Sequence, residues 1–223
     1  MSEPPLIPAP LYGLRTWRLA ADADGERLTG VAQTTPWPAG GAWLDAACRS
    51  GGGHDAPQAD CACGIHAWHP RRWSARRVLA SRFEVPGIVE AAGAVEVHEE
   101  GFRAERGRPY ALFVAPGRNA KLLARLCRRY GAELVEVPGP AALIAWCHER
   151  GLGLDERTVD ELLGPDEADA RRRTRRGKAR RDALRVAAAV IVSGALLLFG
   201  ALFAKDPPGP HHRFGRTGPV VTR

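Results

Sequence analysis

The sequence predicts an α+β domain with a mostly antiparallel sheet and helices packed on one face, followed by a basic linker and one C-terminal transmembrane helix. Three observations support this organisation. Two stretches in the first half of the chain alternate between apolar and polar residues, as β-hairpins do. Helix, strand and helix patterns follow them. A single long apolar run then lies near the C-terminus.

The first half of the chain has the pattern of strands. Residues 1–10 contain four prolines and predict an extended lead. Residues 11–29 alternate on both sides of Asp24-Gly25, a pair that accepts the positive φ required in a hairpin turn. Residues 42–48 predict a short helix, and residues 88–114 predict a second hairpin.

The second half of the domain predicts helix, strand and helix in that order. Asn119 is a suitable N-cap for a helix that Gly131 ends. A strand over residues 133–137 and a helix over residues 141–150 follow, and Asp155 predicts the cap of a last helix. Because Pro165 and a run of charged residues come next, we place the end of the domain near residue 164.

The apolar run at residues 186–204 predicts a membrane span. It has 19 residues without a charge or a proline. As a helix it covers about 28 Å, close to the ~30 Å hydrocarbon core of a bilayer. The expected parts of the chain are therefore an extended lead (1–10), a cytoplasmic α+β domain (11–164), an Arg-rich juxtamembrane linker (165–185), a transmembrane helix (186–204) and a disordered outer tail (205–223).

Basic residues are concentrated beside this span. The net charge is −4 over residues 1–170 and +11 over residues 171–223. Lys and Arg near a span stay in the cytoplasm, so we expect a single-pass protein of the cell membrane with its large domain inside and its short tail outside. The basic residues that set this topology are Arg171, Arg172, Arg173, Arg175, Arg176, Lys178, Arg180, Arg181 and Arg185.

The same cations have two other conceivable uses. A basic segment beside a span attracts anionic lipid headgroups by about 1 kcal/mol per residue. Clustered cations also attract the phosphates of RNA or DNA. The segment has no aromatic residues between its cations and the preceding domain is not basic, so nucleic acid is not an expected partner.

Four potential metal ligands lie within sixteen residues, namely Cys48, His54, Cys61 and Cys63. Thiolate and imidazole are the ligands that tetrahedral zinc prefers, and a cytoplasmic site keeps thiols reduced. The surrounding loop is rich in Gly and Pro, and ordering it costs about 1–2 kcal/mol per residue. A zinc ion would supply that constraint, and a set of four protein ligands would make its role structural.

Other interpretations of this loop remain open. Cys61 and Cys63 are separated by one residue, whereas zinc knuckles usually have Cys-x-x-Cys. The four side chains would then be packing and hydrogen-bonding groups without a metal, or would serve redox or iron–sulfur chemistry. His66 and His69 are alternative ligands if His54 does not bind.

Several motifs occur in a fixed order along the chain. They are Trp37-Pro38-x-Gly40, Cys48, His54-x-x-Pro57, Cys61-x-Cys63-Gly64-Ile65-x-Ala67 and His98-x-x-Gly101-x-Arg103-Ala104-Glu105. Together they resemble an uncharacterised bacterial domain of actinobacterial proteins. The resemblance covers roughly residues 12–137 and implies domain limits without implying a reaction.

Two functions fit these observations. The first is a membrane-anchored cytoplasmic binding or regulatory module, stabilised by structural zinc, that binds an unidentified protein or ligand. The second is a membrane-tethered enzyme that uses the Cys/His loop together with His98-Glu99-Glu100. We expect Cys127 and Cys147 to be buried thiols, and no nucleophile with an identifiable base is evident. The sequence therefore favours a protein that is not an enzyme.

Overall fold

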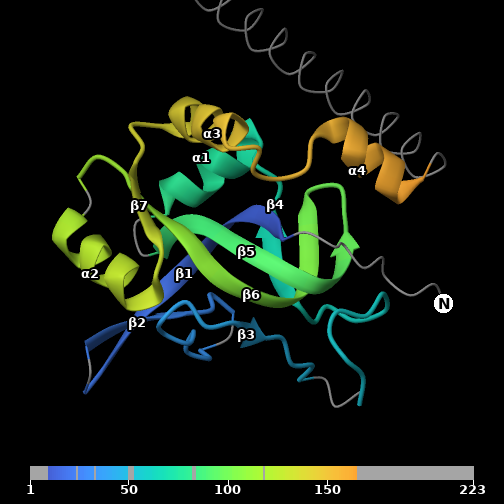
Figure 1. Cartoon of the computed structure of the whole chain (residues 1–223), viewed down its shortest axis with the longest axis horizontal. Helices are drawn as coiled ribbons and strands as arrows, with labels where there is room; N and C mark the ends of the chain where they lie inside the picture. Colours follow the sequence, from blue (N-terminus) through green and yellow to red (C-terminus); the bar gives the residue numbers. More distant parts are fainter. Residues whose placement is uncertain are drawn as a thin grey trace, which may run out of the picture. The chain divides into compact units, whose positions relative to one another are not determined.

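A seven-stranded sheet forms the centre of the described part of the chain (Figure 1). The computed structural model describes residues 10–164, apart from 24, 33, 50–52, 82–83 and 118. The strands are β1 (Leu11–Asp22), β2 (Gly25–Thr29), β3 (Leu44–Asp45), β4 (Ile65–Trp68), β5 (Glu84–Val97), β6 (Gly101–Val114) and β7 (Glu133–Glu136). The helices are α1 (Arg72–Ala80), α2 (Ala120–Tyr130), α3 (Pro140–Glu149) and α4 (Glu156–Leu163). All strand pairs are antiparallel except β6 with β7, so the predicted α+β class is confirmed.

Four of the strands close into a ring. The long strand β5 pairs with β1 and with β6, and the short strand β4 pairs with the same two strands on the other side. The contact that closes the ring is a single residue pair, Leu14 with Trp68. At Gly101 a side chain would collide with the carbonyl group of Ala67, so β4 and β6 approach each other closely only because this position is glycine. The ring gives the loop before β4 a rigid base.

Consecutive residues of β6 contribute to two different cores. Leu112 belongs to a first core with the α2 residues Leu126 and Tyr130. Phe113 belongs to a second core with Val78 of α1 and Leu143 of α3. Successive strand residues point to opposite faces, so the two cores lie on opposite sides of the sheet.

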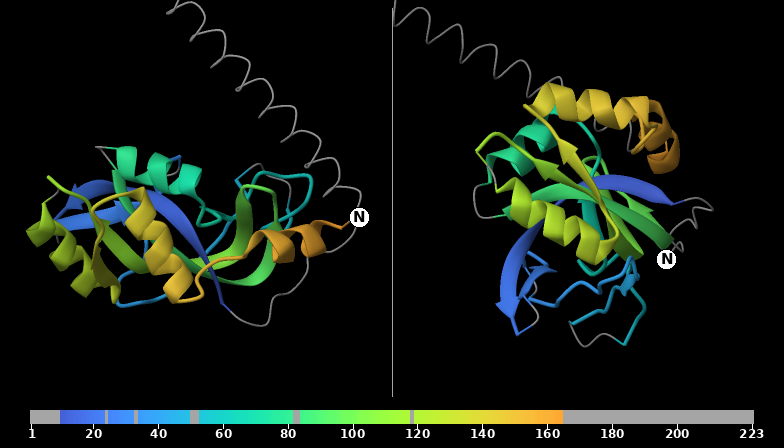
Figure 2. Two further views of the ribbon diagram at one scale, coloured as in Figure 1. Left: turned by 90° about the horizontal axis from the view of Figure 1, so that it is seen from above. Right: turned by 60° about the vertical axis from the view of Figure 1, so that its left-hand side comes forward.

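The helices therefore cover both faces of the sheet, and the expectation that they pack on one face is wrong. Figure 2 shows α1 and α3 on one side of the β5–β6 ribbon and α2 on the other. The reason is the continuous apolar run ALFV at residues 111–114, in which every residue is buried. A strand that buries both faces needs a covering layer on each of them.

Local signals in the sequence predicted the hairpins and the helix ends correctly. β1 and β2 form a hairpin in which Asp22 pairs with Gly25, and β5 and β6 pair from Val97 and Phe102 onward. The side chain of Asn119 accepts a hydrogen bond from the backbone N–H of Leu122, and that of Asp155 accepts one from Thr158. Gly131 ends α2 with φ of 66°. The predicted strand over 133–137 and helix over 141–150 are β7 and α3.

Two segments differ from the sequence-based expectation. The short helix predicted over residues 42–48 does not form; Leu44 and Asp45 instead pair with Gly107 and Arg106 of β6. The Arg108 guanidinium lies over the Trp43 ring, with its Cζ atom 4.7 Å from the ring centroid. This contact with β6 favours the extended chain. The segment over residues 65–80, for which the sequence analysis predicts no helix or strand, forms β4 and α1.

No helix among the described residues is both long and apolar enough to cross a bilayer. The predicted linker (165–185), transmembrane helix (186–204) and outer tail (205–223) lie outside the described residues, as does most of the predicted lead (1–10).

Candidate metal centre and adjoining pocket

The Cys/His loop connects two strands that pair with the same strand. Before the loop, Leu44 of β3 lies opposite Gly107 of β6, and after it Ile65 of β4 lies opposite Ala104. The backbone N–H of Ala46 also donates to the carbonyl oxygen of Glu105. Both ends of the loop are thus fixed at nearby positions along β6, and the described parts of the loop extend away from the ring (Figure 1). We call residues 46–64 the metal loop.

The metal loop brings all four predicted ligands together. The Sγ atoms of Cys48, Cys61 and Cys63 and a ring nitrogen of His54 all lie within 4.8 Å of one another. The Sγ atoms of Cys48 and Cys61 are 3.6 Å apart, and Nε2 of His54 is 3.4 Å from Sγ of Cys63. None of the three thiols is in a disulfide. The four side chains therefore form a compact cluster that could hold a metal ion.

These distances fit zinc. In a tetrahedral site with Zn–S bonds of about 2.3 Å and a Zn–N bond of about 2.0–2.1 Å, two sulfurs lie about 3.8 Å apart, and a sulfur and a nitrogen lie about 3.6 Å apart. The Cys48–Cys61 and His54–Cys63 distances match these edges within about 0.2 Å. Cys63 is buried and the other three residues are half-buried, so the cluster is partly shielded from solvent. A structural zinc is compatible with this geometry.

The surroundings of the Cys63 thiol favour its protonated form. Burial raises the pKa of Cys63, the neighbouring Cys61 and Cys48 raise it further, and a backbone hydrogen bond from Gln58 acts in the opposite direction. Zinc binds the thiolate and displaces the thiol proton. The environment of Cys63 thus disfavours a free thiolate, and a bound divalent cation would reverse that preference.

His66 and His69, the alternative ligands, are engaged elsewhere. Nε2 of His66 lies 2.9 Å from the carbonyl oxygen of Ala62, and Nε2 of His69 lies 3.0 Å from that of His98. A carbonyl oxygen only accepts hydrogen bonds, so both Nε2 atoms carry a proton and donate. The cluster consists of His54 and the three cysteines and does not include these two histidines.

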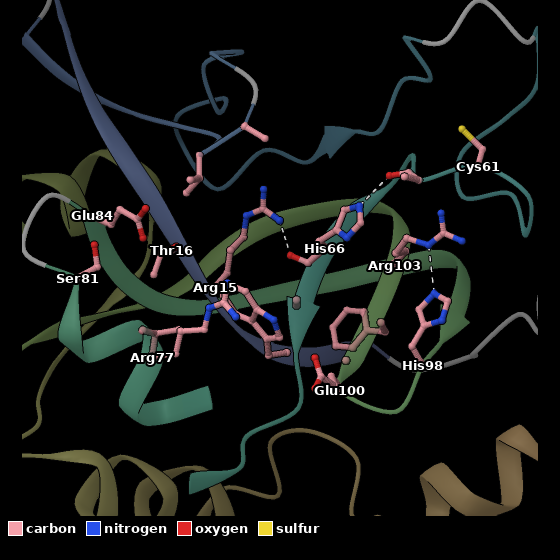
Figure 3. Close-up of a pocket in the computed structure, with 18 of the residues that line it drawn as sticks. Arg15, Thr16, Cys61, His66, Arg77, Ser81, Glu84, His98, Glu100 and Arg103 are labelled. Carbon is pink, nitrogen blue, oxygen red and sulfur yellow. Dashed lines mark hydrogen bonds between the residues drawn. The ribbon is translucent and has the colours of Figure 1, made fainter. Parts of the chain in front are cut away.

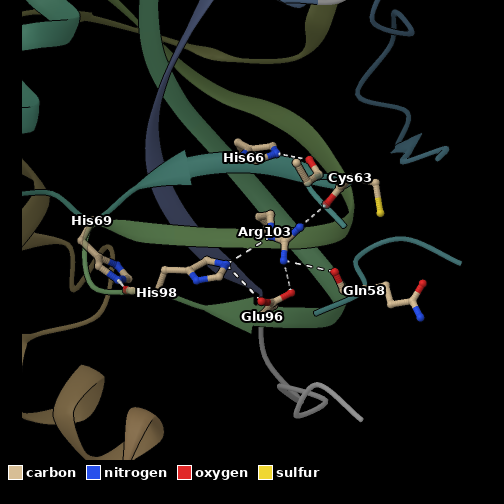
Figure 4. A network of polar contacts seen from close by, with 8 residues as sticks. Gln58, Cys63, His66, His69, Glu96, His98 and Arg103 are labelled. Atoms are coloured by element: carbon tan, nitrogen blue, oxygen red, sulfur yellow. Dashed lines mark hydrogen bonds and ion pairs between the residues drawn. The ribbon is translucent and has the colours of Figure 1, made fainter. Parts of the chain in front are cut away.

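Arg103 of β6 ties the metal loop to the β5–β6 hairpin (Figure 4). Its guanidinium donates to the carbonyl oxygens of Cys63 at 3.3 Å and Gln58 at 3.2 Å. It also forms an ion pair with Glu96 of β5, and its Nε lies 3.2 Å from Nε2 of His98. The Arg103 side chain is only 7% exposed. One buried cation therefore satisfies two carbonyl groups next to the ligands and one carboxylate.

The turn with His98, Glu99 and Glu100 does not join the cluster. His98 contacts Arg103 and lies 3.3 Å from a carboxylate oxygen of Glu96. The carbonyl oxygen of Glu100 accepts a hydrogen bond from the backbone N–H of His69. The turn therefore contacts the metal loop indirectly, through the Arg103 side chain.

The remaining cysteines, Cys127 and Cys147, are buried in the two cores, as expected. Burial raises the pKa of Cys127 to about 11 and that of Cys147 to about 12. Both are therefore protonated near neutral pH and behave as small apolar side chains.

A pocket of about 1180 Å³ adjoins the metal loop (Figure 3). Cys61 lines it from the loop, Arg15 from β1, Arg77 from α1 and His98 from the β5–β6 turn. Its apolar lining includes Phe102 and Val78. Cys61 belongs to both the cluster and the pocket lining. A metal bound by the cluster would therefore hold one wall of the pocket in place.

Our sequence analysis did not identify Arg15 or this pocket. Leu11 and Trp17 of β1 point into the first core, and Arg15 has the same parity along the strand. A charged residue at an inward position of an apolar alternation is the signal that could have identified it. The pocket itself is formed by segments distant in sequence, and spacing alone gives no sign of it.

Comparisons with protein-family models, with curated proteins and with solved structures found no match to this chain.

Proposed function

We propose that this chain is a single-pass membrane protein whose cytoplasmic N-terminal domain is a binding or regulatory module stabilised by one structural zinc ion. The observation that carries the proposal is the convergence of three thiols and one imidazole within 4.8 Å. Four protein ligands complete a tetrahedral shell and leave no position for a substrate or a reactive water. The zinc then organises the metal loop, and the pocket beside the loop is where the module would bind its ligand.

The membrane part of the proposal rests on the sequence. The run at 186–204 has the length and composition of a span, and the nine basic residues at 171–185 favour a cytoplasmic position for the domain. The same basic residues, next to the inner leaflet, would also bind anionic lipid headgroups. The domain would thereby be held close to the membrane surface.

One observation favours an enzyme as the second candidate. Cys61 and His98 line the same pocket, so a thiol and an imidazole face a common space. If the metal is catalytic, its removal should abolish activity but leave the domain folded. If the metal is structural, its removal should also unfold the domain.

We expect full-length protein to fractionate with membranes and to have its C-terminus outside the cell membrane. Alkaline phosphatase, which is active only outside the cytoplasm, should be active when fused after Arg223. A fluorescent protein that matures only in the cytoplasm should stay dark at the same position. Replacement of the nine basic residues of 171–185 by glutamine should weaken this orientation, whereas replacement of the basic residues of 205–223 should not. Recovery of the full chain in the supernatant without detergent, or a fluorescent C-terminal fusion, would contradict the proposal.

A further inference from the structure

Arg15 is a half-buried cation, with its Nε enclosed by the protein, that has no carboxylate partner among the described residues. Its Nη1 donates a hydrogen bond to the carbonyl oxygen of His66, which is the only hydrogen bond that Arg15 makes within the described part of the chain. The guanidinium also lies over the Trp37 ring, 5.1 Å from the centroid. Its Nε is buried and has no hydrogen-bond acceptor. A guanidinium has five N–H donors, so most of the donors of Arg15 are unused.

Two other arginines, Arg103, which is buried, and Arg108, which is half-buried, have acidic partners. Arg103 pairs with Glu96, and Arg108 pairs with Glu90 through two hydrogen bonds of 2.9 and 3.2 Å. Arg15 has only the face of an aromatic ring and one carbonyl group, and burial lowers its pKa to about 10. Partly burying a charge without a counter-ion is unfavourable. An anion in the pocket would remove that penalty.

The space beside Arg15 is large enough for a ligand. The pocket of about 1180 Å³ extends from the metal loop to the C-terminal end of α1, and Arg15 projects into its middle (Figure 3). Arg77 contributes a second cation, held 5.4 Å above the Trp68 ring. Trp68, Val78 and Phe102 provide apolar surface near these charges. A guanidinium next to aromatic and aliphatic surface is suited to a ligand with an anionic group and an apolar body.

The acidic residues of the pocket lie on other elements. Glu84 begins β5, and Figure 3 shows it beside Ser81 and Thr16. Glu100 lies in the β5–β6 turn, and Asp60 lies in the metal loop. Neither Glu84 nor Glu100 forms an ion pair with Arg15 within the described ranges. The negative end of a ligand would therefore be directed to Arg15 and repelled from the sides that Asp60, Glu84 and Glu100 line.

We propose that this pocket binds a small organic anion, a carboxylate or phosphate group on an apolar body, with Arg15 as the residue that recognises the charge. The inference rests on the proposed function, because it names the class of ligand that the binding module would take. Zinc in the metal loop would hold the Cys61 wall of the pocket in place.

The test is titration calorimetry of the full-length protein in a nonionic detergent with phenyl phosphate. Benzyl alcohol serves as the neutral probe, and inorganic phosphate as the anion without an apolar body. We expect phenyl phosphate to bind at least tenfold more tightly than either of them, because only phenyl phosphate satisfies both parts of the pocket. Phenyl phosphate that binds no better than benzyl alcohol would overturn the inference.

Variants test the role of Arg15. We expect Arg15→Gln to weaken phenyl phosphate binding at least tenfold, whereas Arg125→Gln, at an exposed arginine paired with Glu26, should leave it unchanged. Ala80→Trp, at an exposed position on the pocket wall, should also weaken binding while leaving Arg15 intact. Unchanged affinity in both pocket variants would contradict the inference. Because there are two variants, poor folding of one still leaves the other as a test.

Zinc content, measured in each preparation, separates this inference from the proposed function. A protein that contains zinc and does not bind phenyl phosphate would refute only the pocket. A protein that binds phenyl phosphate without zinc would refute the structural metal and keep the pocket.

Discussion

Cys63→Ser is expected to abolish zinc binding and to lower the melting temperature of the full-length protein by about 10 °C or more. Cys63 is the buried member of the cluster and directly precedes the turn into β4. Loss of one ligand opens the shell, and the Gly-rich metal loop then regains its conformational entropy. In a domain of this size, each kcal/mol lost lowers the melting temperature by about 2–4 °C, so about 4 kcal/mol is sufficient for this effect.

Two further variants make the result specific. Cys61→Ser changes a half-buried ligand, so most of its effect should come from the metal and little from packing. Cys147→Ala changes a fully buried thiol in the second core, and it should keep full zinc content despite some loss of stability. Zinc content is measured by inductively coupled plasma mass spectrometry, and unfolding by circular dichroism.

The outcome also separates the two candidate functions. Loss of zinc together with loss of stability supports the structural role. Loss of zinc with an unchanged melting temperature would contradict it and favour the enzyme that uses the Cys/His loop. Full zinc content in Cys63→Ser would remove Cys63 from the ligand set.

Arg103→Met is expected to destabilise the domain by about 3 kcal/mol, because it leaves the partner of a buried ion pair without its counter-ion. The Glu96 side chain is 18% exposed and would lose its cation. The carbonyl groups of Cys63 and Gln58 would lose their donor at the same time. Methionine has similar length and keeps the apolar packing of the arginine stem. Chemical unfolding in urea, with zinc present in excess, gives the free-energy difference.

The matched control for Arg103 is a surface pair. Arg157 lies 2.8 Å from Glu161 one helical turn away, and both side chains are largely exposed. Arg157→Met should cost about 0.5 kcal/mol or less. The double variant Arg103→Met/Glu96→Gln should recover part of the stability, because it removes the uncompensated carboxylate. Equal costs for Arg103→Met and Arg157→Met would show that the Arg103 network does not stabilise the metal loop.

Features of this fold that depend on neighbouring residues were predictable from the sequence. The helix caps at Asn119 and Asp155 and the end of α2 at Gly131 follow from side-chain and backbone chemistry within one turn. The hairpins follow from alternation on both sides of a turn. The four Cys and His residues of the cluster lie in one short segment of the sequence, so their closeness in the structure could be predicted from their spacing.

Features that depend on distant segments were not predictable in this way. The segment over residues 42–48 is extended because Leu44 pairs with Gly107, a partner more than sixty residues away. β4 has only four residues, and its identity as a strand comes from closing the ring between β1 and β6. The pocket requires Arg15, Arg77 and the metal loop to meet, and only the closed ring brings them together. The membrane span and the resemblance to a bacterial domain remain predictions.

X-ray absorption at the zinc K-edge of the full-length protein tests the central claim most directly. The account predicts about one zinc per chain, bound by three sulfurs at about 2.3 Å and one nitrogen at about 2.0–2.1 Å. Protein without zinc, or a shell in which oxygen replaces His54 or one of the cysteines, would contradict the closed structural site.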